Sequence, residues 1–167
     1  GRPFSIILSP TPKTIHSISM HQHKMTPALW YHANDGKLQQ VIAYYAEIMG
    51  ADFESDIPTP LGETPSGYAE IGTVRFFGMP YMIMSTAQEH HSFNDSVAFM
   101  IHCNDQQEID RYWNYFTLEG KASMCGWCND KFGLRWQIIP KNMAELMSRP
   151  NAQQVMYSQS KIIIAAY

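Results

Sequence analysis

The chain has 167 residues, of which 45% are hydrophobic and 16% charged, and this composition excludes an intrinsically disordered protein. A net charge of -3 gives no electrostatic reason to expect nucleic acid or an anionic membrane as a partner. No apolar run approaches the roughly 20 residues that a membrane span needs. Three cysteines, an odd number, do not form a disulfide framework, so we expect a reducing compartment.

Residues 1–24 differ from the rest of the chain. They have no clear hydrophobic period, and their histidines (His16, His21 and His23) could chelate a metal only loosely. They also lack the basic region, apolar core and cleavage site of a secretory signal. Met20 or Met25 could each be a natural start. We interpret residues 1–24 as a leader or an added extension and leave them out of the fold prediction.

The following segment predicts a strand, a helix and several further strands. Residues 25–31 are apolar and aromatic, as strands are. Apolar residues then recur at helical spacing until Gly50, which is expected to end the helix. This apolar helix face consists of Leu38, Val41, Ile42, Tyr45, Ile48 and Met49. Further strands are expected at residues 51–56, 68–71, 74–77 and 81–85, with a proline-rich loop at 58–65.

After the polar residues 88–95, the same order of elements begins again. Residues 96–103 predict a strand, and Asp105 with Glu108 resembles a capping box at the start of a helix. The apolar face of that helix consists of Ile109, Tyr112, Trp113 and Phe116, and Gly120 ends it. Two more strands are expected at residues 125–128 and 134–139, and helices at 143–147 and 152–158.

This repetition predicts a duplicated module. Tyr31 recurs 70 residues later as Ile101, and Gly50 recurs as Gly120. Amphipathic helices often resemble each other, but a chance match of strand, helix face and terminating glycine together is harder to obtain. The expected domains are residues 25–87, residues 96–142 and a helical tail at residues 143–167.

Three blocks of the second half form a recognisable signature. They read Asp105-Gln106-x-Glu108-x-Asp110-x-Tyr112-Trp113, then Cys125-Gly126-Trp127-x-x-Asp130-Lys131-Phe132-Gly133-Leu134-x-Trp136-Gln137-x-x-Pro140, and finally Lys161-Ile162-x-Ile164-Ala165. Together they closely resemble the PhnB-like family, often described as 3-demethylubiquinone-9 3-methyltransferase. That family is a branch of the glyoxalase/bleomycin-resistance (vicinal-oxygen-chelate) superfamily. The resemblance extends over roughly residues 25–167.

The resemblance implies an α+β fold of paired βαβββ modules, with curved mixed sheets around a cavity and helices outside. It also implies a bacterial, cytoplasmic protein that binds a small molecule, and a homodimer whose chains complete one another's cavities. The dimer interface would be supplied by Phe76, Phe77, Tyr81, Met82 and residues 162–164. One departure from the family is an apparent missing strand between Gly120 and Cys125.

Alternation along the strands then predicts which side chains face the cavity. In the first strand, Leu29 and Tyr31 should meet the helix, and Trp30 and His32 should face the cavity. The predicted substrate pocket comprises Trp30, His32, Met82, Met100, His102, Cys125, Trp127 and Gln137. For the cysteine, for Trp127 and for each methionine, ordinary core packing is the alternative interpretation.

Metal-using members of the superfamily place a histidine or glutamate at one inward position on each of four strands. The matching positions here hold Thr26, Ser96, Gln137 and either Met82 or Met84. Hydroxyls, an amide and a thioether are poor ligands for zinc, nickel or iron. We therefore expect no catalytic metal and no other cofactor. His32 and His102 could still contribute to a metal site, but a lone inward histidine is more often a hydrogen-bonding pocket residue.

The Cys-x-x-Cys sequence at Cys125–Cys128 has two functional interpretations, a redox pair or half of a zinc site. No helix follows it to lower a thiolate pKa, and no second motif completes a zinc site. We expect neither function.

Three functions remain to be distinguished. We favour a small-molecule-binding protein without a metal, in which no catalytic residue can be identified. The alternative is a superfamily enzyme, a lyase, isomerase or dioxygenase, that uses a metal or His32 or His102 as a general base. The methyltransferase is disfavoured, because the chain has no Gly-x-Gly-x-x-Gly turn of the kind that binds adenosylmethionine.

Overall fold

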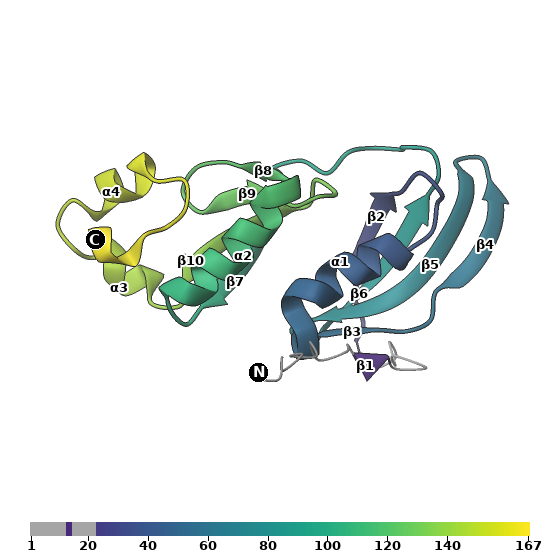
Figure 1. Ribbon diagram of the computed structural model, residues 1–167, viewed down its shortest axis with the longest axis horizontal. Coiled ribbons are helices and arrows are strands. Elements are labelled where there is room, and N and C mark those ends of the chain that lie inside the picture. Colours follow the sequence, from purple (N-terminus) through teal and green to yellow (C-terminus); the bar gives the residue numbers. More distant parts are fainter. Residues whose placement is uncertain (1–12, 15–22) are drawn as a thin grey trace, which may run out of the picture. The chain divides into compact units, whose positions relative to one another are not determined.

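The computed structural model describes residues 13–14 and 23–167. Contacts divide the chain into two compact units, one ending at His90 and the other running from His91 to Tyr167 (Figure 1). The interpretation of residues 1–24 as a leader falls mostly outside the described residues. Of that segment, Lys13–Thr14 forms the short strand β1, which pairs with the first sheet.

The first unit is a βαβββ module with added short strands. It contains β2 (Ala28–His32), α1 (Gln39–Met49), a 3-10 turn (Gly50–Asp52), β3 (Phe53–Ser55), β4 (Thr59–Thr64), β5 (Gly67–Phe76) and β6 (Met79–Thr86). The strand order is β1-β3-β5-β6-β2, and β4 pairs with β5. Strands β2 and β6 are parallel, whereas β5 is antiparallel to its neighbours, so the sheet is mixed.

The second unit repeats this order and adds a C-terminal tail. It contains β7 (Phe99–Cys103), α2 (Gln106–Glu119), β8 (Lys121–Ala122), β9 (Trp127–Asn129), β10 (Arg135–Pro140), α3 (Met143–Met147), α4 (Ala152–Ser158) and a 3-10 turn (Ile164–Ala166). The strand order is β7-β10-β9-β8, with β7 and β10 parallel. The strand expected to be missing after Gly120 is therefore present as β8, but it is only two residues long.

The parallel strand pair of the first sheet, β2 with β6, corresponds to the parallel pair of the second sheet, β7 with β10. Leu29 lies opposite Ile83 in the parallel pair of the first sheet, and Phe99 lies opposite Trp136 in that of the second. The 70-residue offset between β2 and β7 is thus accompanied by equivalent strand pairing. The expectation of two βαβββ modules is confirmed.

In the first unit, aromatic side chains bring α1 onto the sheet. Tyr45 of α1 contacts Phe53 and Phe76, and its hydroxyl lies 3.0 Å from that of Tyr31. The start of the helix is held by the sheet as well, because the Leu38 amide donates to Glu70 Oε1 at 2.9 Å. The buried face of α1 therefore lies against the strands that close the module.

Two local predictions for the first unit are wrong. The segment 58–65 is not a loop but contains β4, which pairs only with β5 and shifts register between Pro60 and Gly62. Proline and glycine are compatible with an edge strand that contains such an irregularity. Ile42, expected in the core, is half-buried, and Tyr44 is buried in its place.

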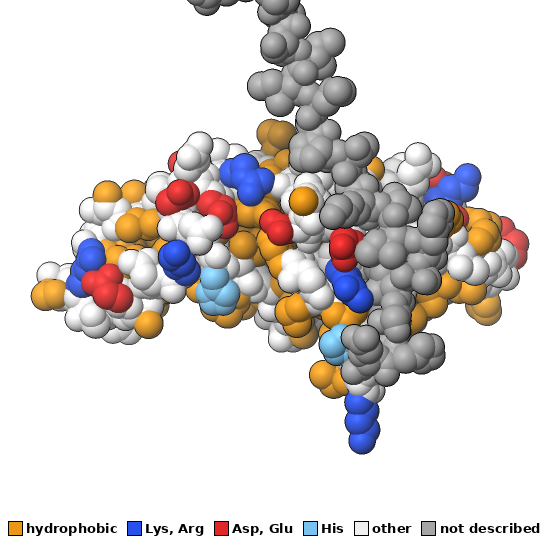
Figure 2. Space-filling model, turned by 90° about the horizontal axis from the view of Figure 1, so that it is seen from below, with side chains coloured by type: hydrophobic (Ala, Val, Ile, Leu, Met, Phe, Trp, Pro, Cys, Tyr) orange, Lys and Arg blue, Asp and Glu red, His pale blue; other side chains and the backbone are white. Residues whose placement is uncertain are grey.

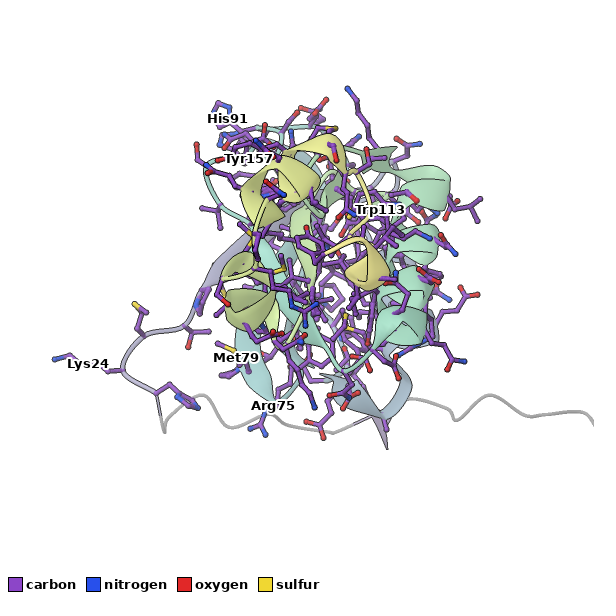
Figure 3. The ribbon with its side chains drawn as sticks, turned by 90° about the vertical axis from the view of Figure 1, so that its left-hand side faces the viewer. Lys24, Arg75, Met79, His91, Trp113 and Tyr157 are labelled. Carbon is purple, nitrogen blue, oxygen red and sulfur yellow. The ribbon has the colours of Figure 1, made fainter. Side chains whose placement is uncertain are left out.

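In the second unit, α2 begins and packs as predicted. The Asp105 carboxylate accepts a hydrogen bond from the Glu108 amide at 2.9 Å, which caps the helix. The predicted apolar face is buried, and Phe116 stacks on Trp136 of β10 with ring centroids 5.0 Å apart. Trp113 lies on the side of α2 that faces the sheet (Figure 3).

A buried carboxylate organises the β9–β10 hairpin. Asp130 is 2% exposed and accepts hydrogen bonds from the amides of Phe132 and Leu134 and from Trp136 Nε1, at 2.8, 3.1 and 2.9 Å. Three donors compensate for the desolvation of this charge. The Asp130–Trp136 part of the signature is therefore required by the hairpin itself.

The C-terminal tail is bound to the second unit through its backbone. The Gln106 side-chain amide donates to the carbonyl of Ile162 at 3.0 Å and accepts from the amide of Ile164 at 2.9 Å. Asp110 pairs with Lys161 at 3.1 Å. The hydrogen bond from Gln106, followed by the charge of Lys161, lowers the pKa of Asp110.

The structure also corrects the expected dimer interface. Phe76 and Tyr81 are buried in the core of the first unit, where their rings contact each other. They are therefore not available to a second chain. Met82, by contrast, is exposed.

We expect Trp113→Ala to destabilise the protein by about 3–5 kcal/mol, because it removes a large side chain that is only 6% exposed. The matched control is Leu118→Ala on the same helix, where the side chain is 82% exposed and the cost should be below about 0.5 kcal/mol. Urea unfolding of both variants measures the difference. Equal losses would mean that the buried face of α2 is wrongly assigned.

Candidate functional site

The alternation of side chains leaves each sheet with a second face, opposite its long helix. In the described part of the first unit, α1 lies on one face of the sheet and no helix covers the other (Figure 1). In the second unit the C-terminal tail reaches this other face at one end, where Ile139 and Ile162 are both buried beside Gly126. We call the face opposite α1 or α2 the open face of each sheet.

The open face of the first sheet has a largely apolar surface. Side chains of β2, β6 and β5 form three cross-strand rows: Ala28, Met82 and Thr73; Trp30, Met84 and Ile71; and His32, Thr86 and Ala69. The Met82 side chain remains 36% exposed. The predicted pocket residues of this unit, Trp30, His32 and Met82, thus lie on one face as expected.

Hydrogen bonds fix the two ring side chains of this face. Trp30 Nε1 donates to Thr86 Oγ1 at 2.9 Å, and that hydroxyl donates to the carbonyl of Gln88 at 2.7 Å. His32 Nδ1 lies 3.2 Å from the Thr86 carbonyl, to which it donates. The indole ring also stacks on the imidazole of His90, with centroids 4.0 Å apart and planes 13° from parallel.

The open face of the second sheet carries the equivalent row. Met100 of β7, Gln137 of β10 and Trp127 of β9 lie side by side, and His102 lies opposite Ile139 in the next row. Met100 is 52% exposed. The side-chain amide of Gln137 is already hydrogen-bonded within the protein, because its Nε2 donates to the carbonyl of Cys125 at 3.0 Å.

Cys125 is the one predicted pocket residue that does not lie on a strand. It precedes β9 with a φ of 58°, and its thiol donates to the carbonyl of Met156 in α4 at 3.5 Å. Its backbone amide and that of Gly126 donate to the carbonyls of Gln159 and Ser160, each at 2.8 Å. This residue is therefore part of the connection between the hairpin and the tail.

The second cysteine of the pair lies in a different environment. Cys128 lies opposite Trp136 on the helix-covered face, and it is fully buried. Burial, followed by the charge of Asp130, raises the pKa of its thiol to about 12. Cys103 is also buried, and its pKa is raised to about 12, mainly by burial. The arrangement gives no support to a redox pair.

Metal ligands do not converge in the described residues. No group of three or more histidine, cysteine, aspartate or glutamate side chains is close enough there to hold an ion. At the positions that match the ligands of metal-using relatives, Gln137 is bonded to a backbone carbonyl, and Thr26 and Ser96 precede their strands. These residues do not fit the metal that the fold commonly holds.

Two surface grooves lie away from the predicted pocket residues. One, of about 540 Å³, lies between α1 and residues 55–58 and includes Ile42, Asp56 and Tyr68. The other, of about 590 Å³, lies between the start of α2 and the tail and includes Lys141 and Ile163. None of the eight predicted pocket residues lines either groove.

Sequence reasoning missed the residues that accompany Trp30. Thr86 and His90 lie 56 and 60 positions later in the chain, at the end of β6 and in the coil that follows it. The polar segment 88–95 has no periodicity that could have indicated a contact with β2.

None of the helices in the described residues is long and apolar enough to cross a membrane.

Comparisons with known proteins agree with this architecture. A model of the family described as 3-demethylubiquinone-9 3-methyltransferase matches residues 23–139. A PhnB protein from Bacillus cereus with the same description has a TM-score of 0.59 and 20% identity, over 71% of this chain and 99% of that chain. The fosfomycin resistance protein FosX from Listeria monocytogenes has a TM-score of 0.51 and 15% identity, over 78% and 100%. No curated protein matches the chain.

These likenesses to solved structures extend to protein PA1353 from Pseudomonas aeruginosa, with a TM-score of 0.51 and 13% identity, over 71% of this chain and 98% of that chain. At such identities they show the fold alone. The α+β fold of paired βαβββ modules is confirmed.

We expect iodoacetamide at pH 8 to modify Cys125 much faster than the other two thiols. Cys103 and Cys128 are buried, and with pKa values near 12 their thiols stay protonated until the pH approaches that value. Mass spectrometry of the native protein should show one modified cysteine, and of the urea-unfolded protein three. Rapid native modification of Cys128 would contradict its placement under α2.

Proposed function

Because the chain belongs to the PhnB-like family described as 3-demethylubiquinone-9 3-methyltransferase, we propose that it is a small-molecule-binding protein that works without a catalytic metal. The ligand is held on the open face of the first sheet. The observation that carries this proposal is the row of Trp30, Met84 and Ile71, an apolar surface opposite α1. A site of this kind combines apolar walls with a few polar groups that orient the ligand.

Polar groups of that kind stand beside the apolar row of the first sheet, where Thr86 and His32 lie at one end of the open face. The open face of the second sheet carries polar groups of its own, Gln137 and His102. Methionines at Met82 and Met100 suit an adaptable surface, because the unbranched thioether side chain changes shape at little cost.

Methyl transfer is not part of this proposal, although the family description names it. Adenosylmethionine usually binds over a glycine-rich turn at the edge of a largely parallel sheet. This chain has no Gly-x-Gly sequence, and among the described long strands each sheet has one parallel pair, β2 with β6 and β7 with β10.

We expect saturable binding of the fluorescent probe 1-anilinonaphthalene-8-sulfonate to the purified protein, with the same affinity in EDTA as in added zinc, nickel or manganese. Trp30→Ala should weaken binding by about tenfold, since a lost aromatic contact surface costs about 1.5 kcal/mol or more. The control Leu118→Ala removes an exposed apolar side chain from α2 and should leave the affinity unchanged.

An equal loss in both variants would contradict a site on the open face. Binding that requires stoichiometric metal, or turnover of a bound molecule that depends on His32 or His102, would favour the superfamily enzyme instead.

We also propose that the protein forms a homodimer, as the family resemblance implies. Hydrophobic side chains reach the surface at several places in the face shown in Figure 2. Among the described residues, the exposed large hydrophobic side chains include Met79, Val97 and Ile163. A stable dimer interface buries about 2,000 Å² or more. Light scattering at micromolar concentration should give about twice the chain mass of 19.1 kDa. A value near 19.1 kDa would exclude the dimer.

A further inference from the structure

Arg75 is a cation on the open face of the first sheet, and its side chain donates no hydrogen bond to any described residue. It lies on β5 in one row with Glu54 on β3 and Pro80 on β6, at the lower edge of the view in Figure 3. Its Nε is enclosed by protein atoms and unpaired. Its Nη1 lies 3.9 Å from Glu54 Oε2, which is too far for a hydrogen bond.

Two other arginines show what is missing at Arg75. Arg135 donates from Nε to Asp95 at 2.8 Å and from Nη1 to two backbone carbonyls at 3.0 and 2.8 Å. Arg149 donates from Nε and Nη2 to Glu145 at 3.0 and 3.2 Å. An enclosed donor that stays unpaired costs stability, so such groups usually have an acceptor. The Arg75 side chain is 32% exposed, and an acceptor can therefore reach its guanidinium group from outside the protein.

The surface between Arg75 and the proposed ligand site is mainly apolar. The next row toward that site contains Met82, and the row after it contains Met84. The charge of Glu54 lies on the other side of Arg75, toward β3. Two rows correspond to about 13 Å along β5. A molecule of that length can place an apolar body on the row of Met84 and an acidic group at Arg75.

We infer that the ligand of the open face is an amphipathic monocarboxylate, with its carboxylate on Arg75 and its apolar body on Met82 and Met84. This inference rests on the proposed function and specifies the ligand class. A carboxylate matches a guanidinium group in shape, because two parallel N–H donors can reach its two oxygens. One negative charge fits better than two, since Glu54 already lies beside the guanidinium group and repels an anion.

The test compares decanoate with 1-decanol, which share a chain length but differ in charge at neutral pH. Isothermal titration calorimetry with the full chain measures both affinities. We expect decanoate to bind about three- to tenfold more tightly than decanol, and the difference to shrink as salt is added. Arg75→Gln should remove this advantage without changing decanol binding, whereas Arg75→Lys, which keeps the charge, should retain part of it.

Two further variants separate a direct contact from a general effect of charge. Lys37→Gln removes one positive charge from the same unit, but Lys37 lines the groove beside α1, so decanoate affinity should stay the same. Glu54→Gln removes the competing carboxylate next to Arg75 and should tighten decanoate binding by about two- to fivefold.

Three outcomes would overturn the inference. They are equal affinity for decanoate and decanol, unchanged decanoate binding in Arg75→Gln, and unchanged or weaker binding in Glu54→Gln. The first and third still decide the matter if circular dichroism shows that Arg75→Gln does not fold. If 1-anilinonaphthalene-8-sulfonate binding depends on Trp30 in those cases, the proposed function stands and only the carboxylate assignment falls. If no probe binding depends on Trp30, both fall.

Discussion

The packing of one long helix against one face of each sheet is the constraint on which the rest of this molecule depends. Side chains along a strand point alternately to the two faces of the sheet. When one strand residue packs against the helix, its two neighbours in the strand therefore point to the opposite face. Tyr31 meets Tyr45 under α1, and Trp30 is therefore turned to the opposite face. In the same way, Trp136 stacks on Phe116 and leaves Gln137 on the open face. The core and the candidate site are two results of one packing arrangement.

The residues that reveal the family are mainly those that hold the second unit together. Asp130 satisfies three donors inside the hairpin, and Gln106 binds the backbone of the tail. Neither side chain lies on an open face. The signature therefore identifies the fold well and says less about the ligand, because it includes Cys125, Trp127 and Gln137 of the predicted pocket but not the other five residues, Met82 and Met100 among them.

Much of the fold could be predicted from the sequence because its signals are local. The cap at Asp105, the apolar face of α2 and the alternation in β2 depend on neighbouring positions alone. The errors arose where tertiary pairing overrides local preference. Pro60 and Gly62 favour a loop, but pairing with β5 makes the segment an edge strand.

For the candidate site, the sequence predicted which strand side chains share a face of the sheet. It did not predict which residues from other segments contact those side chains. His90 lies in a polar segment without periodicity, and its contact with Trp30 spans 60 positions of the chain. Phe76 and Tyr81 were expected at a dimer interface because they are aromatic, yet the same property places them in the core. Residue type alone does not distinguish the two locations.

The attachment of the tail has a consequence for the order in which the protein matures on the ribosome. All hydrogen bonds that pair the strands of the first unit join residues within the first 90 positions, so this unit can close as soon as β6 has emerged. The strands of the second unit pair within residues 99–140, but Gln106 finds its backbone partners only 56 and 58 positions later, so this unit is completed last. During that interval a nascent chain would carry a complete first unit and an incomplete second unit. This is the stage at which we expect a chaperone to bind the chain.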